Sequence, residues 1–157
     1  MQQLLLSIIL CFATNAVRAG DLWATAVSIR PTDGWKIVHR FIADLATPAE
    51  IQNLPTVMTL RWQYQGSQGM PSEAQLKRAY QFEDAIQAQL VATLQGKLVL
   101  ISTGNNQRRW IYYTNHAAQF RHAATLAAQA AQLALNISDE PDPTWALLSS
   151  FKARVQQ

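Results

Sequence analysis

The stretch Val57-Met58-Thr59-Leu60-Arg61-Trp62-Gln63-Tyr64-Gln65 alternates between apolar and polar side chains. Met58, Leu60, Trp62 and Tyr64 fall on one side of an extended chain, while Thr59, Arg61 and Gln63 fall on the other. A period of two residues is the pattern of a β-strand with one buried face. The sequence therefore predicts a half-buried strand here. Its apolar face must pack against other segments of the chain, which lie before and after it in the sequence.

A helix, a hairpin and a second helix are predicted after this strand. Ser72 and Gln75 have the spacing of a capping box, which opens a long helix that runs to about Leu94 and ends at Gly96. Apolar and aromatic residues over 97–103 and 109–114 flank the turn residues 104–107, which predicts a β-hairpin. We expect an alanine-rich helix over 116–135, capped by Asn115, and a short edge strand at 136–138.

This succession of strand, helix, strand, strand, helix and strand from Val57 is the βαββαβ order of a ferredoxin-like unit. Residues 22–45, with a turn at 31–34, predict a β-hairpin that extends the sheet. Asp142 and Pro143 open a C-terminal helix, which we expect at an edge of the sheet. The expected fold class is α+β, with an antiparallel sheet that has helices on one face and a second face free to remain open.

Residues 1–19 have the pattern of a signal peptide. An apolar run over 4–13 is followed by Val17-Arg18-Ala19, a small-residue cleavage pattern, before Gly20. The run is shorter than the roughly 20 residues that a membrane-spanning helix needs, so we expect no stable membrane span. The sequence predicts cleavage near Ala19, a single domain over 20–157, and a periplasmic or secreted location. The alternative is a buried N-terminal strand or helix.

Cleavage would remove Cys11, which is the only cysteine. The mature chain could then form no disulfide and offer no thiolate to a metal. His116 and His122 are six residues apart on the expected helix, whereas zinc-binding helices pair ligands at i and i+4. His39 lies far from both in sequence. We therefore expect neither a metal site nor a cofactor.

Two arginines stand beside three aromatic residues over 108–113, a combination that can bind RNA. Strand alternation places Trp110 and Tyr112 on one face and Ile111 and Tyr113 on the other. RNA-binding sheets combine such residues with a glycine pattern that is missing here. The formal net charge is only +3 and the charges are scattered, so we expect no nucleic-acid partner.

Glu83 is the most informative polar residue in the sequence. It lies seven residues after Leu76, on the stripe that the long helix is expected to turn inward. A carboxylate in that position needs a partner, and the candidates are Arg61, Arg108 and Arg109. One interpretation is a structural ion pair where the helix meets the sheet. The other is a general acid or base tuned by partial burial.

Several blocks of the sequence, in this order and spacing, resemble the bacterial domain of unknown function 695. The blocks are Leu60–Tyr64, Gly69–Ser72, Phe82–Asp84, Thr103–Asn105, Arg108–Thr114 and Asp142–Trp145. The resemblance covers roughly Leu22 to Phe151. It implies a fold and a domain extent, but no reaction, because the family has no assigned activity.

The sequence favours a non-catalytic module, inhibitor-like or immunity-like, that binds another envelope or secreted protein. The oligomeric state is left open. The alternatives are a small envelope hydrolase that uses Glu83 with an arginine, and a structural envelope protein. The candidate binding surface consists of Met70, Pro71, Glu83, Asn105, Arg108, Arg109, Trp110, Asp142 and Trp145.

Overall fold

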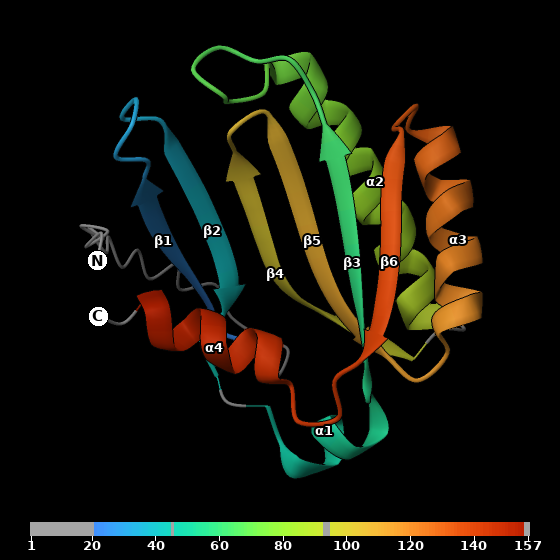
Figure 1. Cartoon of the computed structure of the whole chain (residues 1–157). Coiled ribbons are helices and arrows are strands. Elements are labelled where there is room, and N and C mark those ends of the chain that lie inside the picture. The colour runs from blue at the N-terminus through green and yellow to red at the C-terminus, as the bar shows by residue number, and fades with distance from the viewer. Residues whose placement is uncertain (1–20, 45, 93–94, 156–157) are drawn as a thin grey trace.

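The computed structural model describes residues 21–44, 46–92 and 95–155. The expected signal peptide, its cleavage site and Cys11 lie outside the described residues. The described chain forms six strands and four helices (Figure 1). They are β1 Trp23–Ile29, β2 Lys36–Ile42, α1 Pro48–Asn53, β3 Thr56–Gln63, α2 Glu73–Ala92, β4 Gly96–Gly104, β5 Gln107–Thr114, α3 Ala117–Ala130, β6 Leu135–Pro141 and α4 Ala146–Val155.

All six strands join one antiparallel sheet in the order β1-β2-β4-β5-β3-β6. The predicted α+β class and antiparallel sheet are therefore confirmed, and so is the β1–β2 hairpin that extends the sheet. The chain follows the expected order of strand, helix, strand, strand, helix and strand from β3 to β6. The sheet is not simply that of a four-stranded ferredoxin-like unit, because β1 and β2 lie beside β4.

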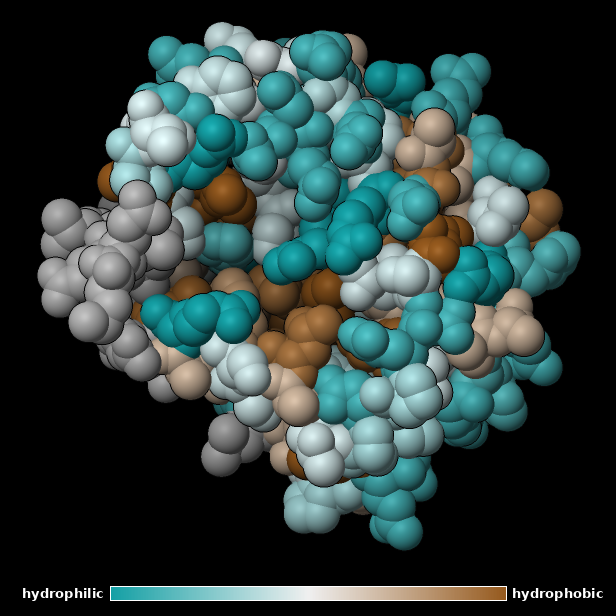
Figure 2. Space-filling view, in the orientation of Figure 1, coloured by the Kyte–Doolittle hydropathy of each residue, from teal (hydrophilic) through white to brown (hydrophobic). Residues whose placement is uncertain are grey.

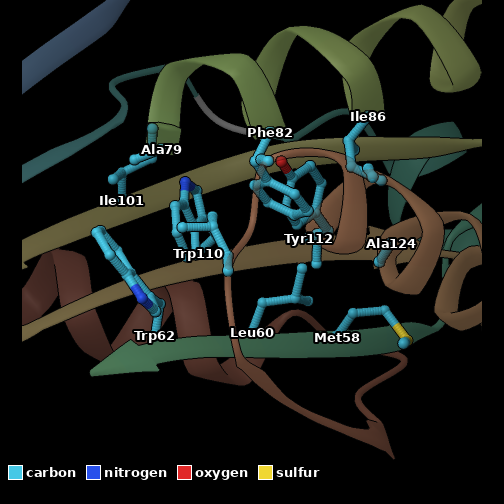
Figure 3. Packing of buried hydrophobic residues seen from close by; sticks show 14 of the residues in the cluster. Met58, Leu60, Trp62, Ala79, Phe82, Ile86, Ile101, Trp110, Tyr112 and Ala124 are labelled. Carbon is cyan, nitrogen blue, oxygen red and sulfur yellow. The ribbon is translucent and has the colours of Figure 1, made fainter. Parts of the chain in front are cut away.

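The alternation of β3 places its side chains on the two faces as predicted, but the strand is not half-buried throughout, because Val57 and Thr59 on the second face are also buried. Met58, Leu60 and Trp62 are buried against α2 and α3, on the same face of the sheet as Trp110 and Tyr112 of β5 (Figure 3). From α2, three fully buried residues pack onto this face: Ala79, Phe82 and Ile86. Tyr80 of the same helix is 47% exposed.

α4 lies across the second face of the sheet rather than at its edge, which corrects the expected position (Figure 1). Its residues Leu148, Phe151 and Val155 are buried in a second apolar cluster with Phe41 of β2 and Ile111 of β5. The physical reason is that this part of the sheet face is itself apolar, so a single helix laid across it removes both surfaces from water. α2 and α3 cover the opposite face.

The boundary between α3 and β6 lies earlier than the sequence indicated. Leu133 and Gln132 donate backbone hydrogen bonds to the Ala128 and Gln129 carbonyls, and Gln132 has a left-handed φ of 55°. This is the hydrogen-bond pattern of a Schellman motif, which usually carries glycine at the left-handed position. Because glutamine gives no such signal, the predicted helix continued to residue 135, where β6 already begins.

No helix within the described ranges is long and apolar enough to cross a membrane.

Candidate functional site

Glu83, Arg108 and Trp110 form a closed hydrogen-bonded cluster between α2 and β5. The Glu83 oxygen Oε1 accepts hydrogen bonds from Arg108 Nη2 at 2.6 Å, Arg108 Nε at 3.1 Å and Trp110 Nε1 at 2.6 Å. Arg108 Nη1 donates to Thr103 Oγ1 at 2.6 Å. The Glu83 side chain is 16% exposed, that of Arg108 is 5% exposed, and Trp110 is fully buried.

This geometry is that of the structural ion pair predicted at the border of helix and sheet. Of the three candidate arginines, the structure brings Arg108 to Glu83. The carboxylate compensates a buried guanidinium that would otherwise be costly to desolvate. The cluster therefore fixes the docking of α2 on the sheet and presents little of itself to a partner.

Asp142 and Trp145 form a second internal cluster, at the start of α4. The Asp142 carboxylate accepts hydrogen bonds from the Ala146 and Leu147 backbones and from the Tyr113 hydroxyl at 2.6 Å. Burial alone would raise the pKa of Asp142, but these hydrogen bonds lower it below its ordinary value. Trp145 stacks on Tyr113 with ring centroids 4.1 Å apart. The Asp142 carboxylate thus binds the first N–H groups of α4, as the sequence led us to expect of a cap, but the helix begins later than predicted, at Ala146, and Trp145 is buried.

The exposed candidates lie together at one end of the sheet, which we call the loop end. It comprises the turn 30–35, the loop 65–71 and the hairpin 104–107, all at the top of Figure 1. Asn106 joins them: its N–H donates to the Gly69 carbonyl at 2.9 Å, and its side-chain Oδ1 accepts from Gly66 N–H at 3.0 Å. Asn105 is exposed and accepts a hydrogen bond from Arg30. Met70 and Pro71 are half-buried in the neighbouring loop.

A second polar region lies on the α4 face of the sheet, where the His39 ring packs against Phe151 of the helix. The register places His39, Ser102, Arg109 and Arg61 directly opposite one another on β2, β4, β5 and β3. Directly paired residues point to the same face, so these side chains form one row. In the space-filling view, hydrophilic residues cross the middle of this face (Figure 2).

Arg61 and Arg109 line a cavity of about 230 Å³ on this face. The other lining residues are Val57, Thr59, Ser138, Asp139, Glu140 and Leu147. Arg109 Nε is buried without a hydrogen-bond partner. Burial lowers the pKa of Arg109, and the positive charges of Arg61 and of Arg154 on α4 lower it further. We call the cavity that Arg61 and Arg109 line the arginine pocket.

His39 is held neutral beside this pocket. Burial, followed by the charges of Arg109 and Arg154, lowers the pKa of His39 from 6.5 to about 4. Its Nδ1 lies 2.8 Å from Ser102 Oγ, and its Nε2 lies 3.0 Å from Ser28 Oγ. A neutral imidazole can satisfy both hydroxyls, because one ring nitrogen donates and the other accepts. The ring therefore adds no positive charge to the pocket.

The sequence placed Arg109 in the candidate set but gave no reason to group it with His39, Ser102 or Arg154. Strand alternation could have placed Arg61 and Arg109 on the face opposite Trp62 and Trp110. Their direct pairing depends on the register of β3 against β5, which is set by contacts along the whole of both strands.

The chain matches the family of unknown function DUF695 over residues 23–151. It belongs to this family. The match confirms the resemblance drawn from the ordered sequence blocks, and it spans β1 to the middle of α4. The DUF695 match thus includes the loop end, Arg61 and Arg109, while Arg154 lies beyond it. No curated protein and no solved structure matches the chain.

Proposed function

We propose that this DUF695 chain is an exported, non-catalytic module that binds another protein through the loop end. The observation that carries the proposal is the concentration of left-handed backbone at that end. Of the described residues with positive φ, only Gln132 and Trp145 lie elsewhere; those at the loop end are Gly34, Gln68, Gly69, Gly104, Asn105 and Asn106.

Such backbone persists only where the surrounding structure enforces it. A left-handed conformation costs a non-glycine residue roughly 1–2 kcal/mol, somewhat less for asparagine. Here the hydrogen bonds of Asn106 and the bond from the Tyr64 hydroxyl to the Gly69 carbonyl, 3.0 Å long, hold two loops together. Strain of this kind tends to gather where a chain binds a ligand or partner. A surface that is already ordered loses little conformational entropy on binding.

The chemistry of the loop end suits a protein partner. Arg30 lies over the ring of Trp35, with its guanidinium carbon 5.5 Å from the ring centroid, and also contacts Asn105. Met70 lies in the adjacent loop. Aromatic residues, methionine and arginine are enriched in protein interfaces relative to the rest of protein surfaces. The expected partner is an envelope or secreted protein that the module inhibits or neutralises.

Export is tested on the full-length chain expressed with a C-terminal tag. Mass spectrometry of the purified protein should find a new N-terminus close to Gly20. A chain that still begins at Met1 would contradict export while leaving the loop end untested, so the binding experiment is performed separately.

Binding is tested by purifying the tagged protein from the envelope fraction and identifying a partner present in stoichiometric amount. Met70→Glu at the loop end should abolish copurification of that partner. The matched control is Leu126→Glu, which places the same charge on an exposed apolar residue of α3. The proposal fails if both variants retain the partner, or if both lose it while remaining folded.

A further inference from the structure

We propose that Arg61 and Arg109 form a binding pocket for a phosphoryl group on the α4 face of the sheet. This site is separate from the loop end, so its test does not depend on the proposed protein-binding function. The arguments concern charge, hydrogen bonding and size.

The arginines of the pocket make none of the ion pairs found among the described residues. The ion pairs among the described residues are made by Arg30, Lys97, Arg108 and Arg121. Arg61, Arg109 and Arg154 take part in none of these pairs, yet they lie close enough for Arg61 and Arg154 to disfavour the charge of Arg109. Like charges held together destabilise the fold unless an anion joins them.

Hydrogen bonding gives the second argument. A buried donor without a partner costs about 1–3 kcal/mol, more when the group is charged, and such donors are rare in native proteins. Arg109 Nε is one of them. A guanidinium presents its donors in a planar fork that matches the oxygens of a phosphoryl or carboxylate group. An oxyanion in the cavity would therefore satisfy the donor that the fold leaves unpaired.

Size and the number of acceptor oxygens favour a phosphoryl group. A volume of about 230 Å³ is below the roughly 300–1,000 Å³ typical of pockets for drug-sized ligands, which suits a small anion or the end of a larger molecule. Asp139 and Glu140 also line the cavity, but Asp139 is already bonded to Arg121. A phosphoryl group offers three acceptor oxygens to the arginines and the lining hydroxyls, whereas a carboxylate offers two, so it can satisfy more of these donors. The hydroxyls of Thr59 and Ser138 are further donors at the lining.

The proposal is tested by titrating the folded protein with inorganic phosphate at constant ionic strength and following backbone amide signals by NMR. We expect saturable shifts of amide signals, confined to residues close to Arg61 and Arg109. Arg61→Gln and Arg109→Gln should each weaken phosphate binding by about tenfold or more, the loss of one charged hydrogen-bonding group. Arg61 is exposed, so its variant tests the site even if the Arg109 variant folds poorly.

The matched control is Arg40→Gln. Arg40 is exposed on β2 and pairs in register with Ile101, whose side chain belongs to the opposite face of the sheet. This variant should leave phosphate affinity unchanged within about twofold. Equal binding of acetate, equal loss in Arg40→Gln, or no saturable shift at millimolar phosphate would each overturn the proposal. Phosphoserine and vesicles containing phosphatidic acid, used as further probes, distinguish a soluble source of the phosphoryl group from a membrane source.

Discussion

At the scale of single residues, two buried ionisable groups are stabilised in opposite ways. Glu83 is paired directly with the guanidinium of Arg108 at 2.6 Å. His39 has only hydroxyl partners and positive neighbours, so its neutral form is favoured. Each arrangement has a measurable consequence for stability.

The first prediction concerns the dependence of stability on pH. His39 has a folded-state pKa of about 4 against an ordinary value of 6.5. Between these values the unfolded chain binds a proton that the folded chain does not, so stability is fully present above pH 6.5 and falls as the pH decreases toward 4. Urea unfolding should show a loss approaching about 3 kcal/mol over that window, at about 1.4 kcal/mol per pKa unit.

His39→Gln is the control for this prediction, because it removes the titrating group but leaves the carboxylates that also protonate in acid. The variant should show a flatter decline of stability between about pH 7 and pH 5. Identical slopes in the two proteins would show that His39 is not held neutral by the fold.

The second prediction concerns the ion pair under α2. Glu83→Gln leaves the buried Arg108 without its counter-charge, and we expect a loss of roughly 2–4 kcal/mol in the free energy of unfolding. Asp84→Asn, at the exposed neighbouring position, should change it by less than about 0.5 kcal/mol. Replacing both partners, as in Glu83→Gln with Arg108→Met, should cost less than the two single losses together. An additive result would mean that the two residues do not stabilise each other.

At the scale of elements, local signals located the segments well. The capping box predicted at Ser72 is formed, with Ser72 bonded to Gln75 at the start of α2, and a second capping box at Thr47 opens α1. The Asn105-Asn106 turn joins β4 to β5, and both residues have the positive φ of a type I′ hairpin. β6 is an edge strand, and Arg121 donates to its Ile137 carbonyl and so covers part of its free edge.

The third prediction concerns that hairpin turn. Asn106→Gly keeps an easy left-handed conformation but loses the hydrogen bond to Gly66, at a cost of about 1 kcal/mol. Asn106→Ala loses the same bond and adds a strained φ, for a total of roughly 2–3 kcal/mol. Thermal unfolding of the two variants separates the lost hydrogen bond from the backbone strain. Equal stabilities of the two variants would mean that backbone strain at this position is negligible.

At the scale of the whole molecule, the sheet has an apolar core on each face. Phe82 of α2 belongs to one core and Phe151 of α4 to the other, and β3, β4 and β5 contribute residues to both. Because both cores pack on the same sheet, the loss of either core exposes one face of the strands on which the other core packs. We therefore expect the described part of the chain to unfold in a single transition.

The fourth prediction follows from this arrangement. Phe82→Ala and Phe151→Ala should each reduce the free energy of unfolding by about 3–5 kcal/mol. Ser150→Ala, on the exposed side of α4, serves as the control and should have little effect. Far-ultraviolet circular dichroism and tryptophan fluorescence should report coincident transitions. A loss below about 1 kcal/mol for Phe151→Ala would mean that α4 contributes little to the fold, as a peripheral edge helix would.

The sequence by itself determined the elements that depend on neighbours in the chain. Three kinds of feature are encoded within a few residues of the chain. They are the alternation of β3, the faces of Trp110 and Ile111 on β5, and the caps at Thr47, Ser72 and Asp142. The end of α3 is not encoded in this way, because Gln132 adopts a conformation for which its side chain gives no signal.

Only the tertiary structure decided which distant groups meet. Alternation states which face a side chain occupies, but the register between strands decides its neighbours, and helix docking decides what covers the face. For that reason Glu83 could be assigned a partner only in the folded chain. For the same reason the convergence of Arg61, Arg109 and Arg154 follows from strand register and from the placement of α4 over the sheet.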